Sequence, residues 1–239
     1  MNKCLQVMLS VVLLCTFLCF FVACSNHNDV PTTYNYISVN GEKLSAEYFG
    51  YFFYLAQSSM LSEAGHTSEN STDEDIETYW KTTEIEGKNA VEVARDVAVD
   101  NAVSQKVQYF AALQNGIELS ADEQASIDAA IEQTVSDNGG SKAFEDMLVS
   151  MGTNIEAYKQ IITENVYIQN LYNKLDSEGA LSVSEDELAA FTEAHSADYL
   201  PEEMLDLAKK DKFNAMAKQW ESEAKIEIDD EAIKQFKII

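Results

Sequence analysis

The near absence of proline, together with a low number of glycines, is the feature that most limits what this chain can fold into. Pro31 and Pro201 are the two prolines among 239 residues, and the chain has nine glycines. Proline ends helices, and proline and glycine are both typical of the turns that a many-stranded sheet needs. A long stretch without proline therefore favours long helices, and the sequence predicts a mostly α fold.

Helix-start and helix-end signals divide the chain after residue 36 into a series of helices. Capping boxes are expected at Ser120, Thr153 and Ser184, each followed three residues later by glutamate. Gly116 is expected to adopt the left-handed conformation and so to end the helix that precedes Ser120. The predicted helices cover residues 45–55, 75–80, 88–114, 120–138, 141–151, 153–175, 184–194 and 201–220.

Two short alternating segments stand at opposite ends of this helical series. Residues 36–39 precede the turn signal Asn40-Gly41, and residues 225–228 follow the last predicted helix. Neither segment is long enough to be stable alone. We therefore expect the two to pair as a short two-stranded sheet that ties the chain ends together around the helices.

The first predicted helix is apolar around most of its circumference. Tyr48 to Leu55 contains seven large aromatic or aliphatic residues in eight positions. Such a helix is either buried on all sides or leaves a hydrophobic face at the surface. The sequence leaves both alternatives open.

Residues 1–23 carry the pattern of an export signal. Lys3 gives a positive start, Val7–Ala23 is apolar and uncharged, and Cys24 follows a small residue. This arrangement resembles the lipobox of bacterial lipoproteins, in which the cysteine is acylated and the chain is cut just before it. The resemblance implies a signal peptide, lipidation of Cys24 with chains such as palmitate, and a flexible tether over residues 24–35. An uncleaved membrane anchor and ordinary cleavage are the alternatives.

Cysteine and charge content exclude several classes of function. The four cysteines are Cys4, Cys15, Cys19 and Cys24, so the part after the tether has no disulfide and no thiol nucleophile. The formal net charge of −25 excludes nucleic acid as an expected partner, because phosphate binding needs a basic surface. We interpret most of the acidic residues as solvated helix faces.

Residues that could support catalysis or metal binding are sparse. The histidines His27, His66 and His195 lie far apart in the sequence and lack the spacing of zinc ligands. Phosphate-binding, dinucleotide-binding and nucleophile-elbow motifs are also missing from the sequence. We therefore expect no metal, no cofactor and no enzymatic activity.

Three segments, taken in their order, resemble a known family. Residues 37–49, residues 116–123 and residues 212–228 are similar to the opening, the middle and the closing segment of SurA/PrsA-type extracytoplasmic chaperones. The resemblance covers about residues 36–230 and implies a helical peptide-binding domain of the SurA N-terminal or trigger-factor C-terminal type. Residues 231–239 are then a C-terminal tail.

The same comparison shows what this chain lacks. Family members commonly carry a parvulin-type prolyl isomerase domain, which here would be inserted near residues 196–201. The segment between the helices on either side is too short for that domain. The resemblance thus implies the fold and the holding of unfolded chains, without isomerase activity.

The expected function is that of an ATP-independent holding chaperone, anchored at the extracytoplasmic face of the cell membrane, whose partners are unfolded exported polypeptides. A homodimer is left open. An acidic scaffold that docks one envelope partner, and a residual prolyl isomerase, are the alternatives. The candidate client-binding residues are aromatic or methionine side chains, which also suit a core: Tyr48, Phe52, Tyr109, Phe110, Met147, Met151, Tyr158 and Tyr172.

Overall fold

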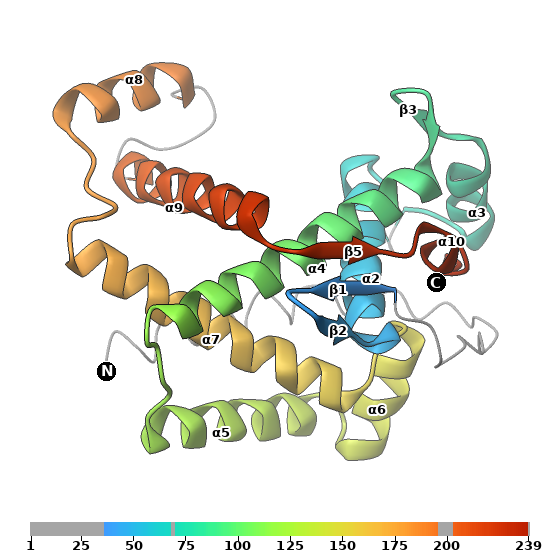
Figure 1. Cartoon of the computed structure of the whole chain (residues 1–239). Coiled ribbons are helices and arrows are strands. Elements are labelled where there is room, and N and C mark those ends of the chain that lie inside the picture. Colours follow the sequence, from blue (N-terminus) through green and yellow to red (C-terminus); the bar gives the residue numbers. More distant parts are fainter. Residues whose placement is uncertain (1–35, 68–69, 196–202, 239) are drawn as a thin grey trace.

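The computed structural model describes residues 36–67, 70–195 and 203–238 (Figure 1). The described residues are mostly helical with a small antiparallel sheet, which confirms the predicted fold class at that level. The elements are β1 (Ile37–Val39), β2 (Glu42–Leu44), α2 (Ala46–Glu63), α3 (Asp73–Thr82), β3 (Glu84–Ile85), β4 (Lys88–Asn89), α4 (Ala90–Gln114), α5 (Ala121–Asp137), α6 (Ser141–Ser150), α7 (Ile155–Ser177), α8 (Glu185–His195), α9 (Met204–Glu223), β5 (Ile226–Ile228) and α10 (Asp230–Ile233).

Several predictions concern segments outside the described residues. These are the signal peptide of residues 1–23, the acylation of Cys24, the tether of residues 24–35 and the insertion point at residues 196–201. Within the described ranges, none of the helices combines the length and the apolar character needed to cross a membrane.

The chain ends pair as predicted. β1 and β5 are antiparallel, with Ile37 opposite Ile228 and Val39 opposite Ile226. The sheet nevertheless has three strands in the order β2-β1-β5, so the expected two-stranded pairing is corrected by the addition of β2. Asn40 and Gly41 form the hairpin turn with φ of 52° and 85°, a left-handed pair that the Asn-Gly sequence favours.

The ends of the helices follow the local sequence in most places. The hydroxyl oxygen of Ser120 accepts from the amide of Glu123, whose carboxylate accepts from the amide of Ser120, and Ser184 and Glu187 do the same. The predicted box at Thr153 is wrong. The cap is Asn154, which accepts from the amide of Ala157, whereas Thr153 is buried.

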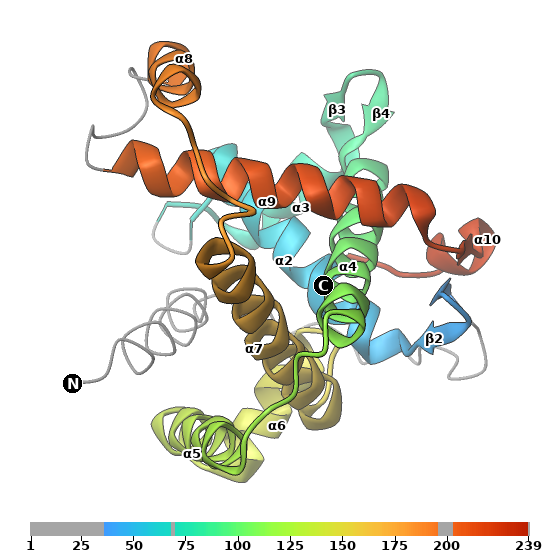
Figure 2. The ribbon, with the colours of Figure 1, turned by 60° about the vertical axis from the view of Figure 1, so that its left-hand side comes forward.

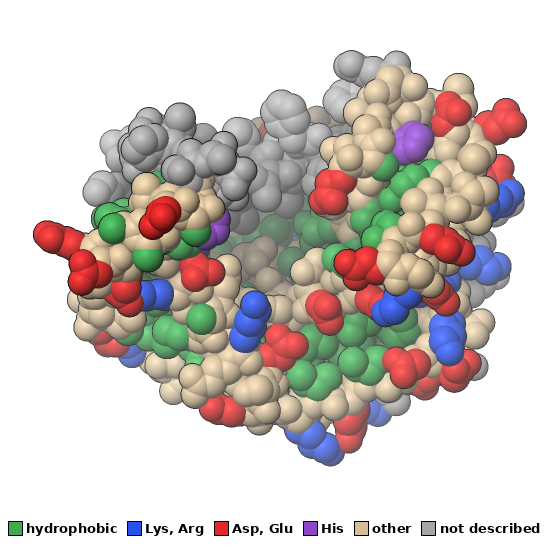
Figure 3. Space-filling view, turned by 90° about the horizontal axis from the view of Figure 1, so that it is seen from above, with side chains coloured by type: hydrophobic (Ala, Val, Ile, Leu, Met, Phe, Trp, Pro, Cys, Tyr) green, Lys and Arg blue, Asp and Glu red, His purple; other side chains and the backbone are tan. Residues whose placement is uncertain are grey.

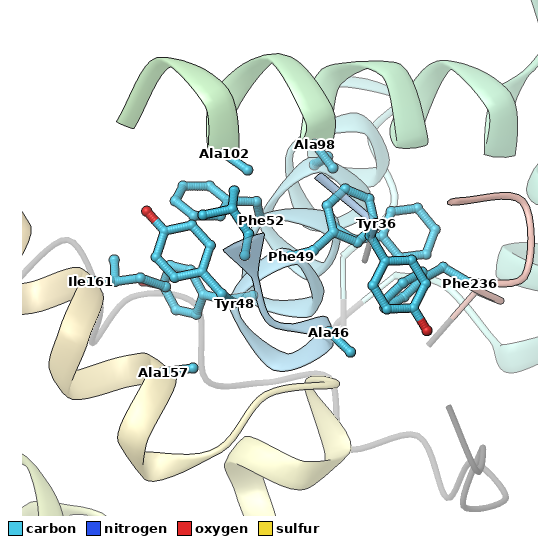
Figure 4. Close-up of a cluster of buried hydrophobic side chains, with 14 of the residues drawn as sticks. Tyr36, Ala46, Tyr48, Phe49, Phe52, Ala98, Ala102, Ala157, Ile161 and Phe236 are labelled. Carbon is cyan, nitrogen blue, oxygen red and sulfur yellow. The ribbon is translucent and has the colours of Figure 1, made fainter. Parts of the chain in front are cut away.

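The main core lies between α2 and α4. Ala94, Ala98 and Ala102 are fully buried on α4, and their small side chains let the aromatic residues of α2 approach closely. Figure 4 shows Phe49 and Phe52 of α2 beneath the alanines of α4. The apolar circumference of α2 is thus buried rather than left as a hydrophobic face.

A close contact between two glycines brings α2 against the turn that joins α6 and α7. A Cβ built on Gly50 lies 1.9 Å from the carbonyl oxygen of Gly152, and Gly152 itself has φ of 72°. Thr153 follows in the same turn, and its hydroxyl oxygen has no hydrogen-bond partner among the described residues. This contact holds α6 and α7 against the base of the core.

We expect Gly50→Ala to lower the free energy of unfolding by about 2–3 kcal/mol, because the added methyl group overlaps backbone that cannot rotate away. Helix propensity alone predicts the opposite sign, a gain of about 0.5–1 kcal/mol. Urea unfolding followed by circular dichroism measures the difference. Ser59→Ala, at an exposed position of the same helix, is the control, and an equally small effect of both variants contradicts the contact.

The C-terminal segment belongs to the core, which corrects the predicted domain end at residue 230. Ala232, Ile233 and Phe236 are buried, and Phe236 packs edge-on against Tyr36 and Phe49 with ring centroids 4.8 and 4.6 Å apart. Arg95 on α4 donates two hydrogen bonds to the carbonyl oxygen of Phe236. At least residues 231–236 of the expected tail therefore help to close the domain (Figure 4).

A second, smaller cluster joins α9 to the ends of α4 and α7. Phe213 of α9 meets Leu171 and Leu175 of α7 and Ala112 of α4 in this cluster. Figure 2 shows α9 lying across α4, with α8 near the end of α9 that is farther from α10. α8 has no buried residue and packs on α9, where Glu187 forms a 2.9 Å ion pair with Lys212.

Candidate functional site

A buried lysine is the most unusual side chain in the described part of the chain. Lys106 lies on α4 among apolar neighbours, and its side chain is 1% exposed. Its ammonium group is 2.6 Å from Oε1 of Glu164 on α7 and 2.5 Å from Oε1 of Glu42 on β2. Burying a charge is costly unless it is paired and hydrogen-bonded, so the two carboxylates are what make this position possible.

Glu164 is almost as buried as Lys106, with a side chain that is 3% exposed. Its carboxylate also accepts a 2.7 Å hydrogen bond from the hydroxyl of Tyr48 and a 2.9 Å bond from Nε2 of Gln160. Helices α2, α4 and α7 each supply a member of this network, which therefore fixes how the three pack together.

Aromatic rings enclose the lysine on its other sides. The ammonium nitrogen is 4.9 Å from the ring centroid of Tyr109 and 5.7 Å from those of Tyr48 and Phe110. A cation over the face of an aromatic ring is attracted by the ring's quadrupole. Lys106 is thus held by two carboxylates and three rings.

The network raises the pKa values of Lys106 and Tyr48. Burial acts to lower the pKa of Lys106, but the charges and hydrogen bonds of Glu164 and Glu42 outweigh it and raise that pKa. Burial, followed by the charge of Glu164 and its hydrogen bond, raises the pKa of the Tyr48 hydroxyl far above its ordinary value. At neutral pH the lysine is charged and the tyrosine is a neutral donor.

A pocket of about 360 Å³ opens directly onto this network. It lies between α4, α5 and α7, with Glu42 of β2 at one side. The buried side chains of Lys106, Glu164 and Ile131 line it, together with the half-buried ring of Tyr109. The remaining lining is polar and comes from α5 and α7: Gln124, Asp128, Lys159, Gln160 and Thr163.

Three of the eight candidate client-binding residues are core residues. Tyr48, Phe52 and Tyr158 are 1%, 7% and 4% exposed, so a client cannot reach them in this structure. Tyr48 is held by its bond to Glu164, and Tyr158 packs edge-on against Tyr51 and Phe144. Their assignment to a client surface is corrected to a role in the core.

The other five candidates are half-buried, four of them at the edges of the two clusters and Tyr109 in the lining of the pocket. They are Tyr109, Phe110, Met147, Met151 and Tyr172. Tyr109 contacts Tyr167 of α7 at a centroid distance of 5.2 Å, and Tyr172 contacts Phe213 of α9 at 5.4 Å. They do not form one surface, because Met147 and Met151 lie at α6 and Tyr172 lies where α7 meets α9.

Sequence reasoning did not find the Lys106–Glu164 network. The available signal was a lysine among Ala98, Ala102, Val103 and Val107, on the side of α4 that faces the core. A charge at such a position demands a buried partner. The sequence does not name that partner, since Glu164 is 58 residues away and Glu42 comes from a strand that was not predicted.

His66 and His195, the two histidines in the described ranges, do not line the pocket. His66 contacts the hydroxyl of Ser71 and the ring of Tyr79, and His195 stacks on Phe191. The described residues contain no group of three or more His, Cys, Asp or Glu side chains that could hold a metal ion.

Comparison with known proteins gives no relative: no family model, no curated protein and no solved structure matches this chain.

Proposed function

We propose that this protein is an ATP-independent holding chaperone for exported polypeptides, anchored at the extracytoplasmic face of the membrane through Cys24. The observation that supports it best is the shape of the helical body. Seen from above, the surface is hollowed between the α8–α9 side and the β3–β4 side, and hydrophobic side chains gather along the hollow among acidic ones (Figure 3). A concave surface of mixed character suits weak binding of many unfolded segments.

Apolar side chains are also exposed at separate places on the helical body, where they add further contacts. Leu113, Val149 and Leu205 are 41%, 46% and 42% exposed and lie on α4, α6 and α9. Half-buried methionines near Val149 add flexible, adaptable surface. The strong negative charge keeps the chaperone itself from associating while it holds a hydrophobic client. The proposal includes no catalytic step.

Suppression of aggregation tests this function. A chemically denatured client is diluted into buffer with the full chain in nanodiscs, and light scattering is followed with empty nanodiscs as the blank. We expect scattering to fall as the chaperone approaches stoichiometric excess, without ATP. Unchanged scattering at that excess contradicts the proposal.

A triple variant separates surface binding from unspecific effects. Leu113→Ser, Val149→Ser and Leu205→Ser together are expected to raise severalfold the concentration needed for suppression, since they remove exposed apolar surface. The matched control replaces three exposed glutamines on helices α4, α5 and α9, none of which lines the pocket, by serine: Gln114, Gln133 and Gln219. Equal activity of both triples contradicts binding through the apolar side chains. Crosslinking that captures one dominant envelope protein favours the scaffold alternative instead.

A further inference from the structure

We propose that the pocket between α4, α5 and α7 binds the basic side chain, lysine or arginine, of a bound polypeptide segment. At about 360 Å³ the pocket is near the lower end of the range for ligand sites, which suits one long side chain better than a folded partner. The inference deepens the proposed function, on which the identity of the ligand as a client segment rests.

The charges that line the pocket favour a cation. Lys106 and Lys159 stand against three carboxylates, those of Glu42, Asp128 and Glu164, which leaves one negative charge in excess. The protein as a whole carries −25 and so concentrates cations near its surface. An anionic ligand is repelled both by the excess negative charge in the pocket and by the negative field of the whole protein. An ammonium or guanidinium group is attracted by both.

Lys106 does not itself serve as a binding group. Its ammonium already pairs with Glu164 and Glu42 and is enclosed by the rings of Tyr48, Tyr109 and Phe110. Its effect on the pocket is to hold Glu42. The side chain of Glu42 is 47% exposed, so one oxygen is fixed by Lys106 while the carboxylate still reaches solvent. Lys106 is thus a positioning residue that pre-orders an acceptor, which lowers the entropic cost of binding.

The walls suit the rest of a basic side chain as well as its charged end. Ile131, which is 5% exposed, and the ring of Tyr109 offer apolar surface for the methylene stem. Asp128 is exposed on α5 and supplies a second carboxylate at the opening. The pocket therefore combines an apolar wall with two acceptors from different elements, Glu42 of β2 and Asp128 of α5.

A matched pair of peptides tests the pocket. Two fluorescein-labelled nonapeptides, identical except for a central lysine or norleucine, are titrated with the full chain in nanodiscs, and anisotropy gives Kd for each. We expect the lysine peptide to bind about fivefold or more tightly than the norleucine peptide at low salt. The difference is expected to become smaller at about 0.5 M salt, because salt at that concentration strongly screens charges near the surface. Equal Kd values for the two peptides overturn the proposal.

Substitutions locate the effect. Asp128→Asn and Glu42→Gln are each expected to weaken lysine-peptide binding by about two- to fivefold and to leave the norleucine peptide unchanged. Glu132→Gln, an exposed carboxylate on the same helix α5 that does not line the pocket, is the control and is expected to change neither Kd. Asp128 has no bond to Lys106, so its variant keeps the test valid even where Glu42→Gln perturbs folding. Lysine-peptide binding that Asp128→Asn leaves unchanged overturns this location.

The peptide and aggregation experiments have separate outcomes. A preference for lysine that depends on Asp128, found together with unchanged light scattering, supports the pocket and rejects the holding function. Suppressed scattering with equal Kd values for both peptides rejects the pocket and leaves the holding function standing.

Discussion

Replacing Lys106 by methionine is expected to lower the free energy of unfolding by about 3–5 kcal/mol. Methionine matches the length of the lysine stem and keeps most of its packing against the rings of Tyr48 and Tyr109. What is lost is the ammonium group, and Glu164 is left as a buried carboxylate without its cation. Urea unfolding, with the m-value compared between variants, measures the loss.

Two further variants show whether charge is the cause. Lys159→Met removes a lysine that lines the same pocket but is exposed, and is expected to change stability by less than about 0.5 kcal/mol. Adding Glu164→Gln to Lys106→Met removes the stranded charge while the amide oxygen can still accept from Tyr48, so much of the stability is expected to return. A double variant no more stable than Lys106→Met contradicts the electrostatic explanation.

The parts of the fold that sequence predicted are those encoded by neighbouring residues. Ser120 with Glu123 and Ser184 with Glu187 form caps from side chains three positions apart, and Asn40-Gly41 needs only its own backbone preference. The pairing of β1 with β5 was predictable for a different reason. A short strand is not stable alone, and the sequence showed two strand-like segments, so each was expected to pair with the other.

The parts that sequence missed are decided by contacts between distant segments. Thr153 has the spacing of a capping residue, yet the turn around it is pressed against Gly50, and Asn154 takes over the cap. Strands β2, β3 and β4 have the sequences Glu-Lys-Leu, Glu-Ile and Lys-Asn, which are mostly charged or polar and lack the apolar alternation that identified β1 and β5. The sequence of the aromatic helix α2 was compatible with full burial and with an exposed hydrophobic face, and the packing of α4 and α7 against it buries it.

The candidate site shows the same limit more sharply. The expectation of aromatic client-binding residues rested on residue type, and residue type does not separate Tyr48 in the core from Tyr109 at a pocket. Lys106 was visible as a charge on a buried helix face, but its role depends on Glu42 and Glu164, which come from other elements. Pocket chemistry of this kind can be recognised only once the fold brings the residues together.

Phe236 offers the strongest test of the corrected domain boundary. Phe236→Ala is expected to lower the free energy of unfolding by about 3–5 kcal/mol, as for other buried phenylalanines. The ring is 3% exposed and packs edge-on against Tyr36, Phe49 and Phe53, with centroids 4.8, 4.6 and 6.2 Å away. Its removal leaves a cavity lined by three rigid rings, which cannot collapse into it as flexible side chains do.

Ile228→Ala is the matched control, because it removes an aliphatic side chain from nearby β5 that is 43% exposed. We expect it to cost less than about 1 kcal/mol. Chemical unfolding of both variants distinguishes a C-terminal segment that completes the core from one that merely trails the domain. In the second case Phe236→Ala costs no more than the control, and deletion of residues 231–239 leaves the unfolding midpoint unchanged. In the first case the deletion is at least as damaging as Phe236→Ala, because it also removes Ile233 and the carbonyl that accepts from Arg95.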